Sequence, residues 1–146
     1  MNRIARRLGA GVLAAASLAA VSFTAAPAQA QTKLACEMRG KWSDEKDEFV
    51  FQAQYNTKHN ADTFDGLYFN AGAGTTALVK GVADKGTWSI VLTYTDAKHK
   101  GQTRELTGQG MRDQATNQIV VNGTFNYKQD GRPIGTGTFT LVGKCK

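Results

Sequence analysis

The chain has 146 residues, 41% of them hydrophobic, and a formal net charge of +6. Three of its 18 basic residues and none of its 12 acidic residues precede position 31, so the rest of the chain carries a net charge of +3. A balance this modest excludes an argument from charge for a nucleic-acid partner, and we expect none.

The first 30 residues are predicted to be a secretory signal peptide. Three arginines precede an apolar, Ala-rich run over residues 8–23, and Ala28-Gln29-Ala30 fits an A-x-A cleavage site. The run is shorter than the ~20 residues that cross a bilayer, so no membrane anchor is expected to survive processing. We expect cleavage after Ala30 and a single domain over residues 31–146 that is secreted or periplasmic.

The two cysteines, Cys36 and Cys145, bracket this domain. They lack C-x-x-C spacing, which favours a disulfide in an oxidising compartment over a catalytic or metal-ligating thiol. In the chain-entropy model, closing a loop of this length contributes up to ~4.7 kcal/mol.

The domain follows a period of two, which predicts strands, and shows no helical period. The alternation is clear where Trp88, Ile90, Leu92 and Tyr94 are separated by smaller residues. Strand-like runs lie at residues 36–43, 49–55, 64–71, 76–83, 88–95, 103–112, 119–127 and 134–143. Turn-forming residues separate the runs, and no stretch suits a crossover helix.

This pattern predicts an all-β fold, an eight-stranded antiparallel up-and-down β-barrel whose terminal strands are tied by the disulfide. Glycines within the strands fit the bends of a small closed barrel. An open sandwich is the alternative, although it leaves strand edges with little protection.

Several short motifs resemble the avidin and streptavidin family of calycin barrels. Gly40-Lys41-Trp42 resembles the G-x-W opening of calycins, and Gly66-Leu67-Tyr68 resembles the G-x-Y of the family's third strand. Further matches follow in the same order, at residues 87–90, 106–109 and 137–140. The resemblance spans roughly Cys36 to Val142 and implies an avidin-like barrel with a ligand site in its mouth.

The family's biotin contacts transfer poorly to this chain. Tyr68 matches the ureido-binding tyrosine, but Asp44 and Asn70 replace an asparagine and a hydroxyl-bearing residue. Gly137 replaces the aspartate of the last strand. The positions of the family's tryptophans hold Leu92, Leu106 and Phe125. High-affinity biotin binding is therefore not expected, because each lost polar partner leaves a buried ligand group unpaired at a cost of ~1–3 kcal/mol.

We expect instead a small, partly apolar ligand in a cup at the barrel mouth. The predicted ligand-binding side chains are Trp42, Asp44, Tyr68, Asn70, Trp88, Leu92, Leu106 and Phe125. In the alternative, these side chains fill one another's space, because an eight-stranded barrel is just wide enough to be packed solid. The glycines at positions 123, 135 and 137 favour a cavity, since they place no side chain inside.

No catalytic residue, metal or cofactor is predicted. The carboxylates at positions 44, 45, 47 and 48 lack the D-x-D-x-D-G pattern of a calcium loop, which favours a solvated charged hairpin. His59 and His99 lie in Lys-flanked loops with no adjacent carboxylate to orient the ring. With no G-x-S-x-G motif, thiol nucleophile or metal triad, an enzyme is not expected.

Two functions stay open. The first is a binding protein with a small-molecule ligand in the mouth. The second is a protein-interaction module, such as an inhibitor or host-directed factor, that uses its loops and outer face. Exposed apolar residues on outward strand faces, such as Leu67, Phe69 and Val120, would favour a protein partner or a homo-oligomer.

Overall fold

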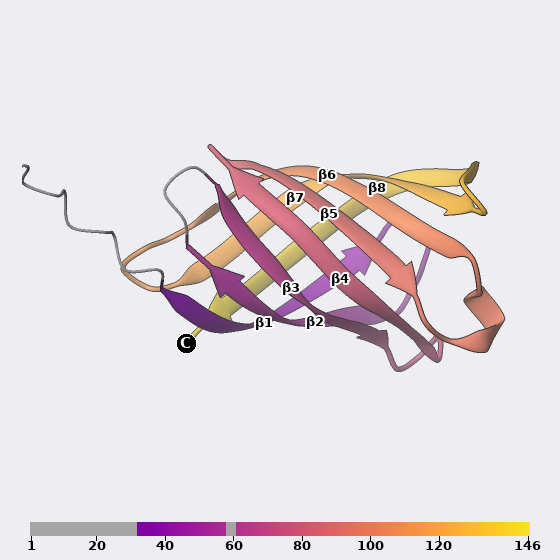
Figure 1. Ribbon diagram of the computed structural model, residues 1–146, viewed down its shortest axis with the longest axis horizontal. Coiled ribbons are helices and arrows are strands. Elements are labelled where there is room, and N and C mark those ends of the chain that lie inside the picture. Colours follow the sequence, from indigo (N-terminus) through magenta and orange to yellow (C-terminus); the bar gives the residue numbers. More distant parts are fainter. Residues whose placement is uncertain (1–31, 58–60) are drawn as a thin grey trace, which may run out of the picture.

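Residues 32–57 and 61–146, the part of the chain that the computed structural model describes, form a closed barrel of eight antiparallel strands (Figure 1). The predicted signal peptide and His59 lie outside the described residues. The strands are β1 (Lys33–Trp42), β2 (Glu48–Asn56), β3 (Asp62–Asn70), β4 (Thr75–Asp84), β5 (Thr87–Tyr94), β6 (Gln102–Arg112), β7 (Gln118–Gln129) and β8 (Arg132–Cys145). Each strand pairs with its sequence neighbours, and β8 pairs with β1. The predicted up-and-down barrel is confirmed.

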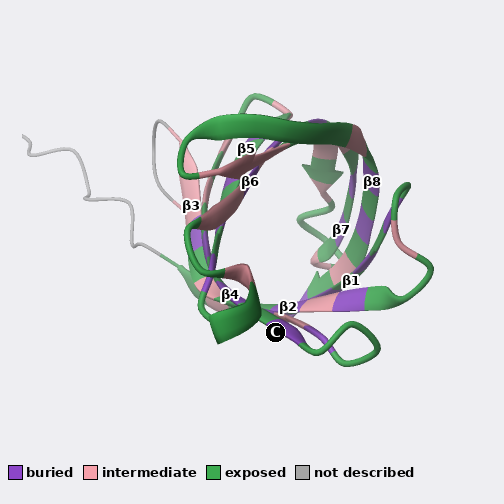
Figure 2. Cartoon of the chain, turned by 90° about the vertical axis from the view of Figure 1, so that its right-hand side faces the viewer, coloured by how far each residue is buried: buried purple, intermediate pink, exposed green. Residues whose placement is uncertain are grey.

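Strand alternation decides which side chains enter the barrel. In β5, Trp88, Ile90, Leu92 and Tyr94 are buried, and the residues between them are exposed. Figure 2, a view along the barrel, shows this change between buried and exposed positions along the strands. The predicted runs are all strands, but β1 and β8 are longer than the alternation indicated. Their ends are set by pairing with neighbouring strands, as where Lys33 lies opposite Asn56.

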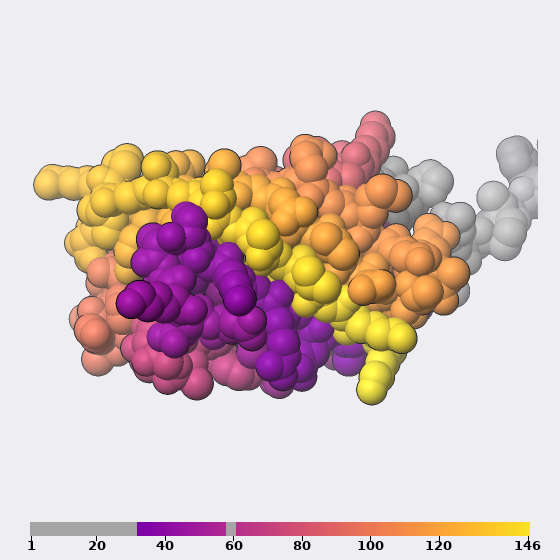
Figure 3. Space-filling model, turned by 180° about the vertical axis from the view of Figure 1, so that it is seen from behind, coloured from indigo at the N-terminus to yellow at the C-terminus, as the bar shows by residue number. Residues whose placement is uncertain are grey.

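The seam between β1 and β8 closes the barrel. The last strand (yellow) runs beside the first (indigo) in Figure 3, and Cys36 lies directly opposite Cys145 in their register. The two cysteines form the predicted disulfide across 109 positions of sequence. The covalent bond therefore reinforces the only pairing in the barrel that joins strands distant in the sequence.

The connections divide between two ends of the barrel, because successive strands run in opposite directions. One end, called the mouth, carries the loops at residues 43–47, 71–74, 95–101 and 130–131. The opposite end, called the disulfide end, carries Cys36–Cys145 and the connections that follow β2, β4 and β6. Figure 1 shows the mouth on the right and the disulfide end on the left.

Two of the hairpins have two-residue turns in the left-handed region. Lys85 and Gly86 have φ of 48° and 85°, and Asp130 and Gly131 have φ of 49° and 77°. Turns with two positive φ angles match the right-handed twist of the flanking strands, and glycine adopts the second position without strain. Each turn falls between two of the strand-like runs that the sequence predicts.

A short 3-10 helix, η1 (Ala97–His99), lies in the loop between β5 and β6. The Asp96 side chain caps it by accepting a hydrogen bond from the backbone N–H of His99. Nowhere in the described residues is there a helix with the length and apolar character that crossing a membrane requires.

Candidate functional site

Arg104 is a charged side chain inside the barrel, just below the mouth. It occupies an inward position of β6 and is only 2% exposed. Its guanidinium carbon lies 4.4 Å from the ring centroid of Trp42, and 4.6 Å from those of Phe125 and Tyr127. Aromatic faces attract a cation electrostatically, and the attraction is stronger where water is excluded. The three rings thus cover much of the cation while leaving its hydrogen-bonding nitrogens to other groups.

Two carboxylates of the 43–47 loop bind this arginine. Nη2 of Arg104 donates to Oε1 of Glu45 at 2.6 Å and to Oδ2 of Asp44 at 3.2 Å. A buried charge needs such partners, because leaving it unpaired costs several kcal/mol. The loop starts from a fixed point, since Thr138 donates its backbone N–H to Oγ of Ser43 at 2.8 Å. The expectation of a merely solvated hairpin is therefore wrong for these two acids.

The other two nitrogens of Arg104 have no partner. Nε and Nη1 are buried, and no described group accepts a hydrogen bond from either. Together they carry three N–H donors. Buried donors in folded proteins are nearly always paired, and an exception calls for an explanation. Arg104 therefore keeps three buried N–H donors that no described group accepts.

Asn70 connects the acidic loop to β3. Its Nδ2 donates to Oε2 of Glu45 at 3.0 Å, and its Oδ1 accepts from the backbone N–H of Ala73 at 3.0 Å. Glu45 is therefore held by two buried side chains, Arg104 on one oxygen and Asn70 on the other. Asn70 itself is buried at the end of its strand, as its inward parity requires.

Tyr68 lies directly below this layer. Its hydroxyl accepts from Nε1 of Trp42 at 3.3 Å and from the hydroxyl of Thr75 at 3.4 Å. The Tyr68 ring is 5.5 Å from the ring of Phe49 and 5.9 Å from that of Tyr94. The hydroxyl is thus engaged with the protein's own side chains, so Tyr68 supports Trp42 from beneath.

Tyr94 and Tyr127 complete the wall of the mouth, with ring centroids 5.9 Å apart. Burial raises the pKa of Tyr94 far above its ordinary value, although the positive charge of Arg104 acts against the shift. Burial likewise raises the pKa of Tyr127. Both phenols therefore stay protonated, and the Tyr127 hydroxyl donates to Oε1 of Gln102.

His99 has a carboxylate partner, contrary to the expectation from the sequence. Nδ1 of His99 lies 2.6 Å from Oδ1 of Asp96 within the η1 turn. Partial burial tends to raise the pKa of Asp96, but hydrogen bonds from His99 and from the backbone of Thr76 hold it below its ordinary value. The His99 ring packs 5.3 Å from that of Tyr94. The pair was missed because the helical turn, rather than sequence adjacency, brings the two residues together.

The structure divides the eight predicted ligand-binding residues between regions. Around Arg104 it gathers six of them: Trp42, Asp44, Tyr68, Asn70, Leu92 and Phe125. Trp88 lies nearer the disulfide end, 5.8 Å from the ring of Tyr55 and 5.2 Å from that of Phe64. Leu106, two residues further along β6 than Arg104, is buried opposite Ile90.

The barrel below the mouth is filled by aromatic rings. Trp42 stacks on Phe49 at 4.2 Å and meets Phe125 edge-on at 5.1 Å. A Cβ at Gly123 would lie 2.8 Å from Phe139, and one at Gly137 would lie 2.7 Å from Phe125. The interpretation of these two glycines as open space is wrong, because the β6 backbone and the Phe139 ring crowd Gly123, and Ser43 and the Phe125 ring crowd Gly137.

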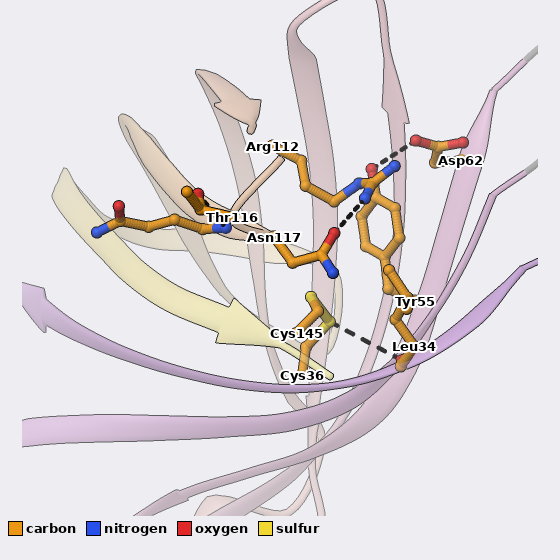
Figure 4. Close-up of a disulfide and its surroundings, with 9 residues drawn as sticks. Leu34, Cys36, Tyr55, Asp62, Arg112, Thr116, Asn117 and Cys145 are labelled. Atoms are coloured by element: carbon orange, nitrogen blue, oxygen red, sulfur yellow. Dashed lines mark hydrogen bonds between the residues drawn. A yellow bond between two sulfur atoms is a disulfide. The ribbon is translucent and has the colours of Figure 1, made fainter. Parts of the chain in front are cut away.

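The disulfide end holds a second inward arginine, Arg112, shown in Figure 4. Its guanidinium carbon lies 5.3 Å from the Tyr55 ring centroid, and its Nη1 donates to Oδ1 of Asn117 at 2.8 Å. The Tyr55 hydroxyl donates to Oδ2 of Asp62 at 2.6 Å. These contacts cover the end of the barrel above Cys36–Cys145.

The open depressions of the outer wall, among the described residues, include two of several hundred Å³. One, of about 620 Å³, crosses the outer faces of β3 to β6, and the other, of about 510 Å³, lies near Met111 and Val120. Within residues 32–57 and 61–146, no three His, Cys, Asp or Glu side chains are grouped to hold a metal ion.

Arg104 was missed by the sequence reasoning, although a signal for it exists. It has the same strand parity as Leu106, so the alternation of β6 places its charge inside the barrel.

Comparisons of the chain with family models, with curated proteins and with solved structures each found no match.

Proposed function

We propose that the protein is an exported, non-catalytic binding protein that takes a small, partly apolar ligand at the mouth of its barrel. The observation that carries the proposal is Arg104, a buried cation between three aromatic rings with two nitrogens unpaired. A mainly apolar site with a few directed polar groups is the usual composition of a small-molecule pocket. The Cys36–Cys145 disulfide supports export to an oxidising compartment.

The packing of the interior supports a ligand that rests at the mouth instead of entering a deep cup. Trp42, Phe49 and Phe125 occupy the space beneath Arg104. The ligand would contact the guanidinium, the rings of Tyr94 and Tyr127, and the amide of Asn70. This arrangement differs from the biotin contacts of the avidin-like resemblance, and we propose that biotin binds weakly or not at all.

Native mass spectrometry of the protein recovered from its own culture medium tests the proposal. We expect a retained small molecule, and we expect it to be lost from an Arg104→Met variant but kept by Arg112→Met, the matched change at the other end. The second readout is a melting-temperature screen of wild type against a broad panel of small organic compounds. A protein with no retained molecule and no compound that raises its melting temperature would contradict the proposal.

An interaction with another protein is the second candidate, and the outer face of the barrel favours it. Met111, which is 77% exposed, lies directly opposite Val120, and Val120 lies opposite Val142. This row of exposed apolar side chains crosses three adjacent strands. Sedimentation of wild type and of a Met111→Gln variant tests it: self-association that the substitution weakens would support a homo-oligomer on this face.

A further inference from the structure

We propose that the ligand of the mouth carries a carboxylate, and that Asp44 and Glu45 occupy the place of this carboxylate in the free protein. The inference rests on the proposed function and names the chemical class of the ligand. Ligand binding then requires Asp44 and Glu45 of the 43–47 loop to release Arg104.

The rings around Arg104 limit the directions from which its guanidinium can be approached. The guanidinium carbon lies within 4.6 Å of the ring centroids of Trp42, Phe125 and Tyr127. Rings that cover a planar cation leave its edges for hydrogen bonding, and the edges of a guanidinium match the two oxygens of a carboxylate. The side chains already bonded there, Asp44 and Glu45, are themselves carboxylates.

Asp44 and Glu45 use only part of the hydrogen-bonding capacity of Arg104. Both bind the same nitrogen, Nη2, while Nε and Nη1 stay buried and unpaired. A carboxylate in the plane of the guanidinium contacts two nitrogens at once. A ligand free of the loop's geometry can therefore make a pairing that Asp44 and Glu45 do not make.

The charges around Arg104 favour exchange of carboxylates over addition of another one. Arg104, Asp44 and Glu45 together carry a net charge of −1, so a further anion would place three carboxylates around one cation. Like charges at such short range repel, which favours exchange over addition. The side chains of Asp44 and Glu45 are 42% and 26% exposed, so water is at hand to solvate them once displaced.

Asn70 supplies a second contact for the incoming carboxylate. When Glu45 leaves, Nδ2 of Asn70 loses its acceptor. Asn70 is buried at the mouth and held in place through its Oδ1, which accepts from Ala73. Its freed N–H group can donate to the incoming carboxylate. The rings of Tyr94 and Tyr127 then favour an aromatic or otherwise apolar body behind that carboxylate.

Titration calorimetry with benzoate and benzamide, which share a ring and differ in charge, tests the inference. We expect wild type to bind benzoate at least tenfold more tightly than benzamide. Asp44→Asn/Glu45→Gln should bind benzoate at least tenfold more tightly than wild type does, because amides hold Arg104 less strongly than carboxylates. The single variant Glu45→Gln should show the same change to a smaller degree, and Arg104→Lys should weaken benzoate binding at least tenfold.

The matched control is Asp47→Asn/Glu48→Gln, which removes the same charge from the end of this loop and the first residue of β2. Glu48 pairs with Lys41 on the surface, and neither Asp47 nor Glu48 bonds Arg104. We expect this control to bind benzoate within twofold of wild type. An equal gain in the control would overturn the inference, because it would reduce the effect to net charge.

The two proposals fail in different ways. Equal affinity for benzoate and benzamide, or benzoate binding that Glu45→Gln leaves unchanged, overturns the carboxylate exchange while leaving a mouth ligand in place. If neither probe binds wild type or Asp44→Asn/Glu45→Gln, and a broad panel of neutral and cationic compounds also fails to bind, the mouth is not a ligand site and both proposals fall.

Discussion

The two inward arginines of β6 sit at opposite ends of the same barrel and have different surroundings. Arg112 is half-buried, lies over the Tyr55 ring and donates to the neutral amide of Asn117 (Figure 4). Arg104 is buried, lies among three rings and is bonded to two carboxylates through one nitrogen. Both have the same strand parity, so the difference comes from the connections that cover each end.

The two arginines also differ in what covers them. At the disulfide end, Arg112 is covered by the short β6–β7 turn beside a covalent bond. At the mouth, Arg104 is covered by two acidic side chains that reach solvent. Replacing a partner is easier where that partner is well hydrated once released.

The largest expected effect is at the packed layer beneath the mouth. Tyr68→Ala should lower the free energy of unfolding by about 3–5 kcal/mol, because it removes a buried ring that packs on Phe49 and Phe51. Urea denaturation followed by tryptophan fluorescence measures it. Tyr68→Phe is the control, and its loss should stay near ~1 kcal/mol, since only hydrogen bonds to the hydroxyl are removed. A loss below ~1 kcal/mol for Tyr68→Ala would mean that the interior is not packed as described.

The next effect is at the disulfide end. Cys36→Ser/Cys145→Ser should lower the free energy of unfolding by about 2–4 kcal/mol, because the unfolded chain regains the freedom of a long loop. Thermal unfolding with and without reductant provides the measurement, with the double variant as the control that reductant leaves unchanged. Finding both thiols free in the exported protein would refute the assignment.

A smaller loss in the free energy of unfolding is expected when one partner of either arginine is removed. Glu45→Ala should cost about 1–2 kcal/mol, since Arg104 loses one charged partner but keeps Asp44. Asn117→Ala should cost less than ~1 kcal/mol, because Arg112 is partly hydrated and its partner is neutral. Parallel denaturation curves decide the order. Equal losses would show that Glu45 and Asn117 stabilise the fold to the same extent.

The smallest effect concerns Asp96 at the rim of the mouth. Its pKa is held below the ordinary 3.8, so the ionised carboxylate stabilises the fold above that pH, and the contribution is lost as pH falls through the folded value. Asp96→Asn should therefore be less stable than wild type at pH 6, and the difference should shrink toward pH 2. Melting temperatures across this range test it, and a constant difference would contradict the assignment.

Part of the candidate site follows from the strand pattern alone. The inward positions of Trp42, Tyr68 and Phe125 follow from alternation, because a residue's face in a strand depends only on its parity. The partners of Arg104 do not follow, since Asp44 and Glu45 lie 60 and 59 positions earlier in the chain. Loop side chains have no periodicity to orient them, so only the closed barrel shows where these carboxylates go.

The sequence by itself determined the architecture, because each local signal agreed with the others. Alternation defined the strands, turn-forming residues between the strand-like runs defined the hairpins, and Cys36 and Cys145 indicated the pairing of the first and last strands. Only the tertiary structure decided that neighbouring backbone and side chains fill the space at Gly123 and Gly137, and that Arg104 keeps two nitrogens unpaired. The reason is physical: strand face and turn type depend on neighbours along the chain, whereas packing volume and hydrogen-bond satisfaction depend on groups that meet only when the barrel closes.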